Sequence, residues 1–145
     1  MPPHLKTVYI APVEDKSGSG ELRLREIFRD RLIRKFQDDN TLLIAEKANA
    51  DALVECTIVS FTDAASNIVS NQNNNASVSG KRITIGAKVL FKDLVKKKTM
   101  SEKSYSNNSD YLTNVANVQE KRIEAVESTI DRITDDILIG TVSNW

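Results

Sequence analysis

The sequence lacks most of the residues on which disulfide, zinc and nucleophilic chemistry depend. Its 145 residues include a single cysteine, Cys56, so no disulfide can form within the chain. We expect Cys56 to be a buried structural thiol, because it sits in the apolar run from Ala52 to Ile58. The only histidine is His4, which we place in an N-terminal tail at residues 1–5. Such a tail histidine cannot complete a zinc ligand set or a catalytic triad, so we predict a protein that is not an enzyme and has no metal or cofactor.

Long apolar runs, a basic excess and a phosphate-binding motif are also missing. No stretch approaches the roughly 18 apolar residues of a membrane-spanning helix, and the first residues do not form a signal peptide. The 20 Lys and Arg residues balance the 20 Asp and Glu residues, which argues against a general nucleic-acid binder. The Gly18-Ser19-Gly20 segment lacks the spacing of a dinucleotide or P-loop motif, so we interpret it as a flexible turn.

Hydrophobic periodicity predicts two helices. The first covers residues 21–38, with Ser19 as its N-cap, and its apolar residues recur at a spacing of four: Leu24, Phe28, Leu32 and Phe36. The second covers residues 118–139 and carries one apolar stripe, formed by Ile123, Val126, Ile130, Ile133 and Ile137. This stripe can pack on the domain's own sheet or form a coiled coil with a partner. Its length of about two heptads favours the sheet.

Short alternating or β-branched segments predict five strands, at residues 7–13, 41–45, 52–62, 81–93 and 100–106. Apolar and polar residues alternate most regularly at residues 81–93, which indicates a strand with one buried face and one solvent-exposed face. The polar residues 63–80 predict a long flexible hairpin loop, which is either a plain tip or a binding element. A second polar loop is expected at residues 106–117.

These elements predict one α+β domain over residues 1–145, in the order β-α-β-β-β-β-α. Two amphipathic helices are expected to cover one face of a mixed four- to five-stranded sheet. The other face, or its loops, then remains for function.

Basic residues gather on and around the most regular strand. Arg82, Lys88 and Lys92 alternate with its apolar residues, Lys81 lies at its start, and three lysines follow it at residues 96–98. Cations on a half-apolar β surface suit an amphiphile with phosphate headgroups. Ordinary solvated strand charge is the other interpretation.

Several runs resemble the lipopolysaccharide-assembly lipoprotein family, the LptE-like subunits of the outer-membrane translocon. The matching runs are residues 3–8, 11–18, 32–36, 50–58 and 81–85, together with the C-terminal helix. The resemblance covers nearly the whole chain, although each run is a fold-determining pattern without a catalytic signature. It implies two helices on a mixed four-stranded sheet and a non-enzymatic role.

The resemblance also implies a location and partners. Members are anchored through a lipidated N-terminal cysteine to the periplasmic face of the outer membrane. They plug the lumen of a large LptD-like β-barrel and bind lipopolysaccharide through basic strand and loop positions. This sequence has no cysteine near residue 1, so we expect a signal peptide and its lipid-attachment cysteine to precede Met1 in the full-length precursor.

A second resemblance gives an alternative function. The run Val8–Gly18 is similar to periplasmic lipoproteins that activate peptidoglycan synthases or assist secretion. Those proteins act through protein–protein contacts and have no lipid ligand. Lipopolysaccharide binding, or co-purification with a large barrel, would separate the two functions.

Overall fold

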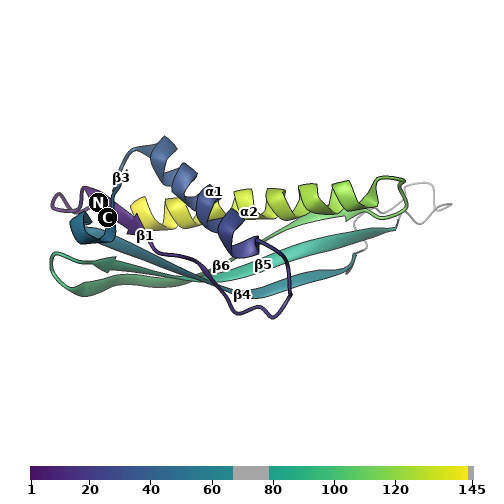
Figure 1. The fold of residues 1–145 in the computed structure, drawn as a ribbon, viewed down its shortest axis with the longest axis horizontal. Helices are drawn as coiled ribbons and strands as arrows, with labels where there is room; N and C mark the ends of the chain where they lie inside the picture. Colours follow the sequence, from purple (N-terminus) through teal and green to yellow (C-terminus); the bar gives the residue numbers. More distant parts are fainter. Residues whose placement is uncertain (67–78, 144–145) are drawn as a thin grey trace.

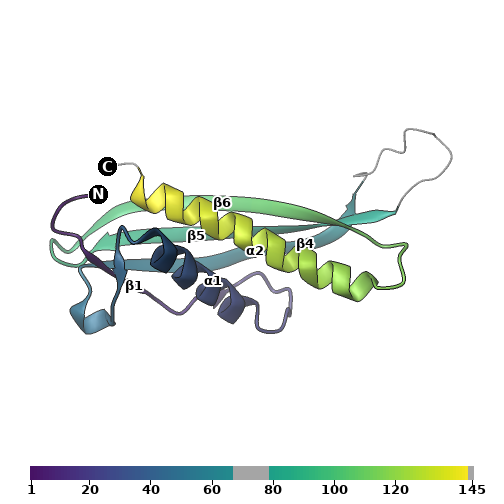
Figure 2. The same ribbon diagram turned by 90° about the horizontal axis from the view of Figure 1, so that it is seen from above.

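The computed structural model describes residues 1–66 and 79–143 and consists of one long sheet covered on one face by two helices (Figure 1). The strands are β1 (Thr7–Ile10), β2 (Glu14–Asp15), β3 (Leu43–Ile44), β4 (Ala52–Ser66), β5 (Gly80–Asp93) and β6 (Lys98–Leu112). The helices are α1 (Leu24–Asp39), α2 (Val118–Val142) and the short 3₁₀ helix η1 (Lys47–Asn49). Helices α1 and α2 lie on the same side of the sheet (Figure 2), which confirms the predicted α+β class.

The sheet is mixed, with the strand order β3-β1-β4-β5-β6 and β2 paired to β4. Strand β1 runs parallel to β3 and β4, and α1 makes the crossover that parallel neighbours require. Strands β4, β5 and β6 form antiparallel pairs. The two-residue β2 adds a strand to the predicted four or five, because Glu14 and Asp15, which we expected in a polar loop, pair with Thr57 and Ile58.

The core lies between the sheet and the helices. Its sheet side includes the alternating residues predicted on β5, which are Ile83, Ile85, Ala87, Val89 and Phe91. Its helix side includes Leu24, Phe28, Leu32 and Phe36 of α1 and Ile130, Ile133 and Ile137 of α2, all buried. The helices are also joined by ion pairs, since Lys35 lies 2.8 Å from both Asp131 and Asp135.

Helix α1 begins three residues later than the periodicity predicts. Arg23 has a left-handed backbone with φ of 61°, so the chain does not follow a helical path before Leu24. Ser19 is therefore not the N-cap. Its hydroxyl accepts a hydrogen bond from the Glu21 N–H at 3.2 Å, within the turn that precedes the helix.

Helix α2 buries most of the predicted apolar stripe, including Ile130, Ile133 and Ile137, but not its first residue. Ile123 is 55% exposed, so the prediction for this residue was wrong. The sheet twists beneath the helix, and the buried side of the helix therefore rotates along its length. Three buried threonines lie on this side: Thr129, Thr134 and Thr141 each donate a hydroxyl hydrogen bond to the carbonyl four residues earlier, at 2.7 Å. A threonine bonded in this way can enter a core that an apolar pattern does not reveal.

The predicted loops and tail are shorter than expected. Strand β6 continues to Leu112, through half of the loop predicted at 106–117. Residues 63–66 of the loop predicted at 63–80 belong to β4, and residues 67–78 lie outside the described residues. Within the predicted tail, Leu5 is buried and His4 Nε2 lies 2.5 Å from the Asp93 carboxylate. The start of the chain therefore packs against the end of β5.

Replacing Gly140 by alanine is expected to lower the free energy of unfolding by about 1–3 kcal/mol. Alanine ordinarily stabilises a helix interior by about 1 kcal/mol relative to glycine. Here a methyl group would overlap the Tyr105 hydroxyl of β6. Urea unfolding followed by circular dichroism measures the effect. Adding Tyr105→Phe should restore part of the loss, whereas a stabilised Gly140→Ala variant would contradict the close packing.

Candidate functional site

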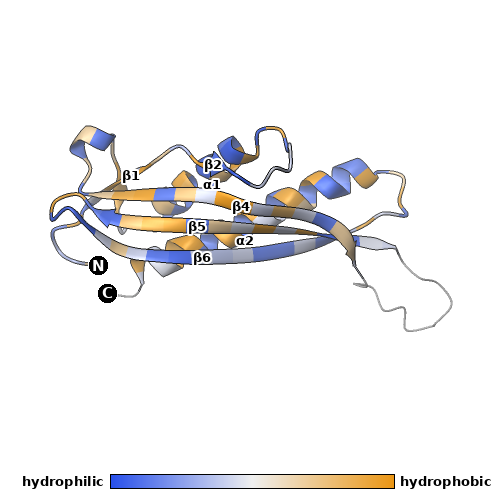
Figure 3. Ribbon diagram, turned by 90° about the horizontal axis from the view of Figure 1, so that it is seen from below, coloured by the Kyte–Doolittle hydropathy of each residue, from blue (hydrophilic) through white to orange (hydrophobic). Residues whose placement is uncertain are grey.

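The open face of the sheet carries three of the four cations predicted as binding residues. Arg82, Lys88 and Lys92 alternate with the buried residues of β5 and therefore point away from the helices. Figure 3 shows this face, with hydrophilic residues along much of β6. Lys81 has the opposite parity and lies on the helix side, 3.5 Å from Asp63. The structure thus separates Lys81 from the other three.

Each cation on the open face has a carboxylate partner on a neighbouring strand. The pairs are Arg82 with Asp110 at 2.7 Å, Lys88 with Glu102 at 2.5 Å and Lys92 with Glu55 at 3.0 Å. The charges of these three pairs cancel. The sequence of β5 alone predicts a basic surface, but the register with β4 and β6 makes it a surface of neutral pairs.

The apolar Leu53, Ala64 and Leu90 share this face, and small hydrogen-bonding side chains occupy much of the rest of it. They are Thr57, Ser60, Thr62, Thr84, Ser104, Ser106 and Asn108. Hydroxyl and amide groups both donate and accept hydrogen bonds, as the hydroxyls of a sugar do. The open face is therefore a mainly polar surface with a few apolar positions and three ion pairs set along it.

A β-bulge in β4 changes which face its last residues reach. The register shifts between Ile58 and Ser60, so one extra residue stands against β5. Simple alternation along residues 52–62 would place Phe61 on the same face as Val59, but the bulge makes Phe61 pair with Ile85 on the helix side. The Arg122 guanidinium of α2 lies 5.9 Å from the centre of the Phe61 ring.

Beyond the bulge, Asp63 stands at the centre of a polar network. It accepts hydrogen bonds from Arg122 Nε and the Tyr111 hydroxyl, both at 2.8 Å, and Arg122 also pairs with Glu21. Burial alone would raise the pKa of Asp63, but the bonds from Arg122 and Tyr111 and the charge of Lys81 lower it overall. Burial, together with Asp63, raises the pKa of Tyr111 to about 12. The network holds matched charges and joins α2 to the sheet, which indicates a structural role.

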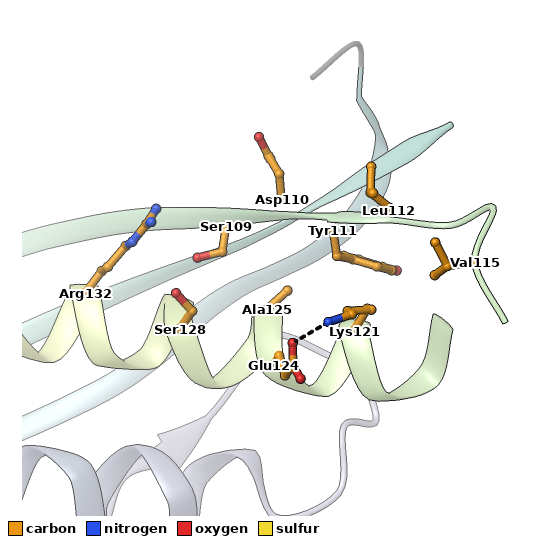
Figure 4. A pocket seen from close by; sticks show the side chains of 10 residues that line it. All are labelled: Ser109, Asp110, Tyr111, Leu112, Val115, Lys121, Glu124, Ala125, Ser128 and Arg132. Atoms are coloured by element: carbon orange, nitrogen blue, oxygen red, sulfur yellow. Dashed lines mark hydrogen bonds and ion pairs between the residues drawn. The ribbon is translucent and has the colours of Figure 1, made fainter. Parts of the chain in front are cut away.

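A groove of about 420 Å³ lies next to this network, between β6 and the first half of α2 (Figure 4). One end is formed by the apolar side chains of Tyr111, Val115 and Ala125, with the Lys121–Glu124 ion pair beside them. The other end is polar and is formed by Ser109, Ser128 and Arg132. The groove therefore offers two different environments along the strand.

The polar end of the groove has unused hydrogen-bonding capacity. Ser109 is 6% exposed, and its buried hydroxyl has no hydrogen-bond partner among the described residues. Arg132 donates to the Asn108 carbonyl at 2.8 Å and meets no carboxylate within the described part of the chain. Sequence reasoning missed this groove because it assigned residues 106–117 to a loop. The alternation of Tyr105, Asn107, Ser109 and Tyr111 was the available signal, and it contains only two large side chains.

Among the residues that the structure describes, the remaining reactive groups form no evident catalytic cluster. Burial raises the pKa of the Cys56 thiol to about 12, which keeps it protonated at neutral pH, as expected for a structural thiol. Within residues 1–66 and 79–143, no three His, Cys, Asp or Glu side chains are grouped so that they could hold a metal ion. No helix in the same ranges is long and apolar enough to cross a membrane.

A family model described as LptE, lipopolysaccharide-assembly, matches residues 5–139. The chain belongs to this family. No curated protein matches the sequence significantly.

Solved structures similar to this LptE-family chain share its fold at low sequence identity. A hypothetical protein from Chlamydia trachomatis has a TM-score of 0.64 at 12% identity, over 94% of this chain and 95% of that one. A protein from Xanthomonas campestris of the DUF330 family has a TM-score of 0.61 at 12% identity, over 95% and 86%. A minor lipoprotein from Acinetobacter baumannii has a TM-score of 0.56 at 10% identity, over 93% and 90%. At such identities, these likenesses show the fold alone.

Membership of the LptE family gives the chain a general role. The family consists of non-enzymatic lipoproteins that work with the lipopolysaccharide transport machinery. The chain is thus a bacterial envelope lipoprotein of the lipopolysaccharide-assembly type.

Proposed function

We propose that this domain binds lipopolysaccharide through the open face of its sheet during delivery to the outer membrane. Arg82, Lys88 and Lys92 supply charge for the phosphate groups, and the hydroxyl and amide side chains between them bind sugar hydroxyls. The observation that carries the proposal is this mainly polar open face with its three solvent-accessible cations, in a chain of the LptE family. Lys81 is left out because it lies on the helix side.

The ion pairs on this face are compatible with phosphate binding. Solvent screens exposed ion pairs, so each holds its partners weakly. A phosphate group, with more negative charge and more acceptor oxygens than a carboxylate, can compete for the same cation. Glu102 and Asp110 would then act as competitors that limit the affinity of the empty face for anions.

We further propose the cellular setting of this activity. A lipid-modified cysteine upstream of Met1 anchors the domain to the periplasmic face of the outer membrane, and a large LptD-like β-barrel is its partner, with the domain seated in the barrel lumen. Family membership supports both statements. Co-purification of the membrane-anchored precursor with a barrel protein of the outer membrane would test them directly.

Removing cations and removing their acidic partners should change lipopolysaccharide binding in opposite directions. The double variant Arg82→Gln, Lys88→Gln is expected to weaken binding by about threefold or more, because exposed charges each contribute modestly. The double variant Glu102→Gln, Asp110→Asn should strengthen binding, because it frees the same two cations. Displacement of a fluorescent lipopolysaccharide by the unlabelled one measures both, and added salt should weaken binding.

The matched control is Lys121→Gln, which removes an exposed cation paired with Glu124 at 3.4 Å on α2, on the helix side of the sheet. It should bind as the unaltered protein does, and all variants should retain their thermal midpoint. If the two double variants change affinity in the same direction, or not at all, the open face is not the site. If the unaltered domain binds no lipopolysaccharide, the protein–protein regulator becomes the better hypothesis.

A further inference from the structure

Strand β6 forms one edge of the sheet. The hydrogen bonds of its neighbours show which of its residues direct their backbone N–H and C=O groups outward, away from β5. The Thr113 N–H donates to the Ser79 carbonyl, so odd-numbered residues here direct their backbone groups toward β5. Asn108 accepts a hydrogen bond from Arg132 of α2 at its carbonyl, which confirms that even-numbered residues point outward. The outward N–H and C=O groups near the end of the strand therefore belong to Asn108, Asp110 and Leu112.

This edge is closed at Asn108. The Asn108 N–H donates to the Asn107 side chain at 2.9 Å, and its carbonyl accepts from Arg132 at 2.8 Å. Side chains that use the backbone groups of an edge strand prevent pairing with another strand. Among the described residues, nothing bonds to the outward backbone groups of Asp110 and Leu112. An open stretch of strand edge thus runs directly beside the groove.

The groove and the open edge together have the form of a peptide site. Several peptide-binding domains accept an extended segment as an added strand, and a neighbouring surface selects its alternate side chains. Side chains two residues apart on an added strand would face α2, spaced by about 7 Å. One would reach the apolar end at Tyr111 and Ala125, and the other would reach the polar end at Ser109 and Arg132.

We propose that an extended segment of a partner protein adds to the outer edge of β6 beside Asp110 and Leu112. This partner segment carries an acidic residue two positions away from an apolar residue. The carboxylate pairs with Arg132, which meets no other carboxylate among the described residues, and accepts a hydrogen bond from the unpartnered Ser109 hydroxyl. A peptide fits better than a lipid, because only a peptide backbone offers alternating donors and acceptors to the strand edge. This site is separate from the lipopolysaccharide surface proposed above.

A displayed library of random linear heptapeptides, selected against the folded domain, tests the proposal. Selected sequences should contain Asp or Glu two positions from an apolar residue. In nuclear magnetic resonance spectra, a synthetic peptide of the selected sequence should slow hydrogen exchange at the Asp110 and Leu112 amides. The amides of Ser109 and Tyr111, which belong to the β5–β6 ladder, should be protected already in the free domain. Binding that leaves the Leu112 exchange rate unchanged would overturn strand addition.

Two variants separate the backbone and side-chain parts of the site. Leu112→Pro removes an outward N–H that the β5–β6 ladder does not use, and edge strands tolerate proline there. It should abolish peptide binding, while Ser106→Pro, at an outward position away from the groove, should not. Arg132→Glu should weaken binding by about tenfold or more, because it replaces an attraction with a repulsion. Unchanged affinity in Arg132→Glu would refute the carboxylate pairing, and if Leu112→Pro does not fold, the exchange measurement decides.

Discussion

Replacing Ile130 by alanine is expected to lower the free energy of unfolding by about 2–5 kcal/mol. Ile130 is fully buried between α2 and the sheet, and its truncation leaves a cavity that the surrounding β strands cannot collapse to fill. Guanidinium unfolding followed by circular dichroism measures the loss. The same experiment examines the architecture, because a helix stripe that served a partner would tolerate the change.

Ile123→Ala is the matched control on the same helix. Its side chain is 55% exposed, and alanine favours helix formation over isoleucine. We expect a change within about 0.5 kcal/mol. A large loss at residue 123 together with a small loss at residue 130 would contradict the packing of α2 on the sheet.

Arg122→Ala is the second substitution with a large expected effect, a loss of about 2–3 kcal/mol of unfolding free energy. Arg122 pairs with Asp63 of β4 and with Glu21 before α1, and its removal leaves both carboxylates with less compensation. The three side chains are less than a third exposed, so solvent replaces the lost interactions only in part. Thermal unfolding measures the loss. Lys121→Ala, next along the helix and paired weakly with Glu124 at 3.4 Å, should change stability little.

The same network makes stability depend on pH in a defined direction. The folded-state pKa of Asp63 lies below its ordinary value, so its stabilising contribution is present above about pH 4 and is lost as the pH falls through the lowered pKa. Asp93 and Asp131 also have lowered pKa values and add losses of the same sign. The contribution of Asp63 is the difference in acid dependence of the unfolding free energy between the unaltered protein and Asp63→Asn. This difference should be smaller when both proteins also carry Arg122→Ala. An equal acid dependence in the unaltered protein and Asp63→Asn would contradict the network.

The α+β fold could be predicted from the sequence because its main elements have regular patterns. The alternation in β5 and the spacing of four in α1 place their buried residues correctly. The bulge at Ile58/Ser60 could not be predicted, since one extra residue leaves no compositional signal. Ile123 was wrongly predicted to be buried, because the periodicity assumes that the same side of the helix faces the sheet along its whole length. The sheet is twisted, so the side of α2 that faces it changes along the helix.

The candidate site was predicted less completely, because it depends on which strands are neighbours. The positions of Arg82 and Lys88 on one face follow from alternation alone. Their partners Asp110 and Glu102 are separated from them in sequence and become neighbours only through the β5–β6 register. The groove depends on the same strand, and its residues were assigned to a loop.

The two ends of the described chain lie together, at the opposite end of the long axis from the groove (Figure 1). A strand of 15 residues such as β6 spans roughly 50 Å. If either end is tied to a surface, the sheet acts as a stiff arm that holds the groove at a fixed height above it. A flexible linker of similar reach would let the distance vary widely. Only a partner segment that lies at that height above the surface could then pair with the part of β6 beside the groove.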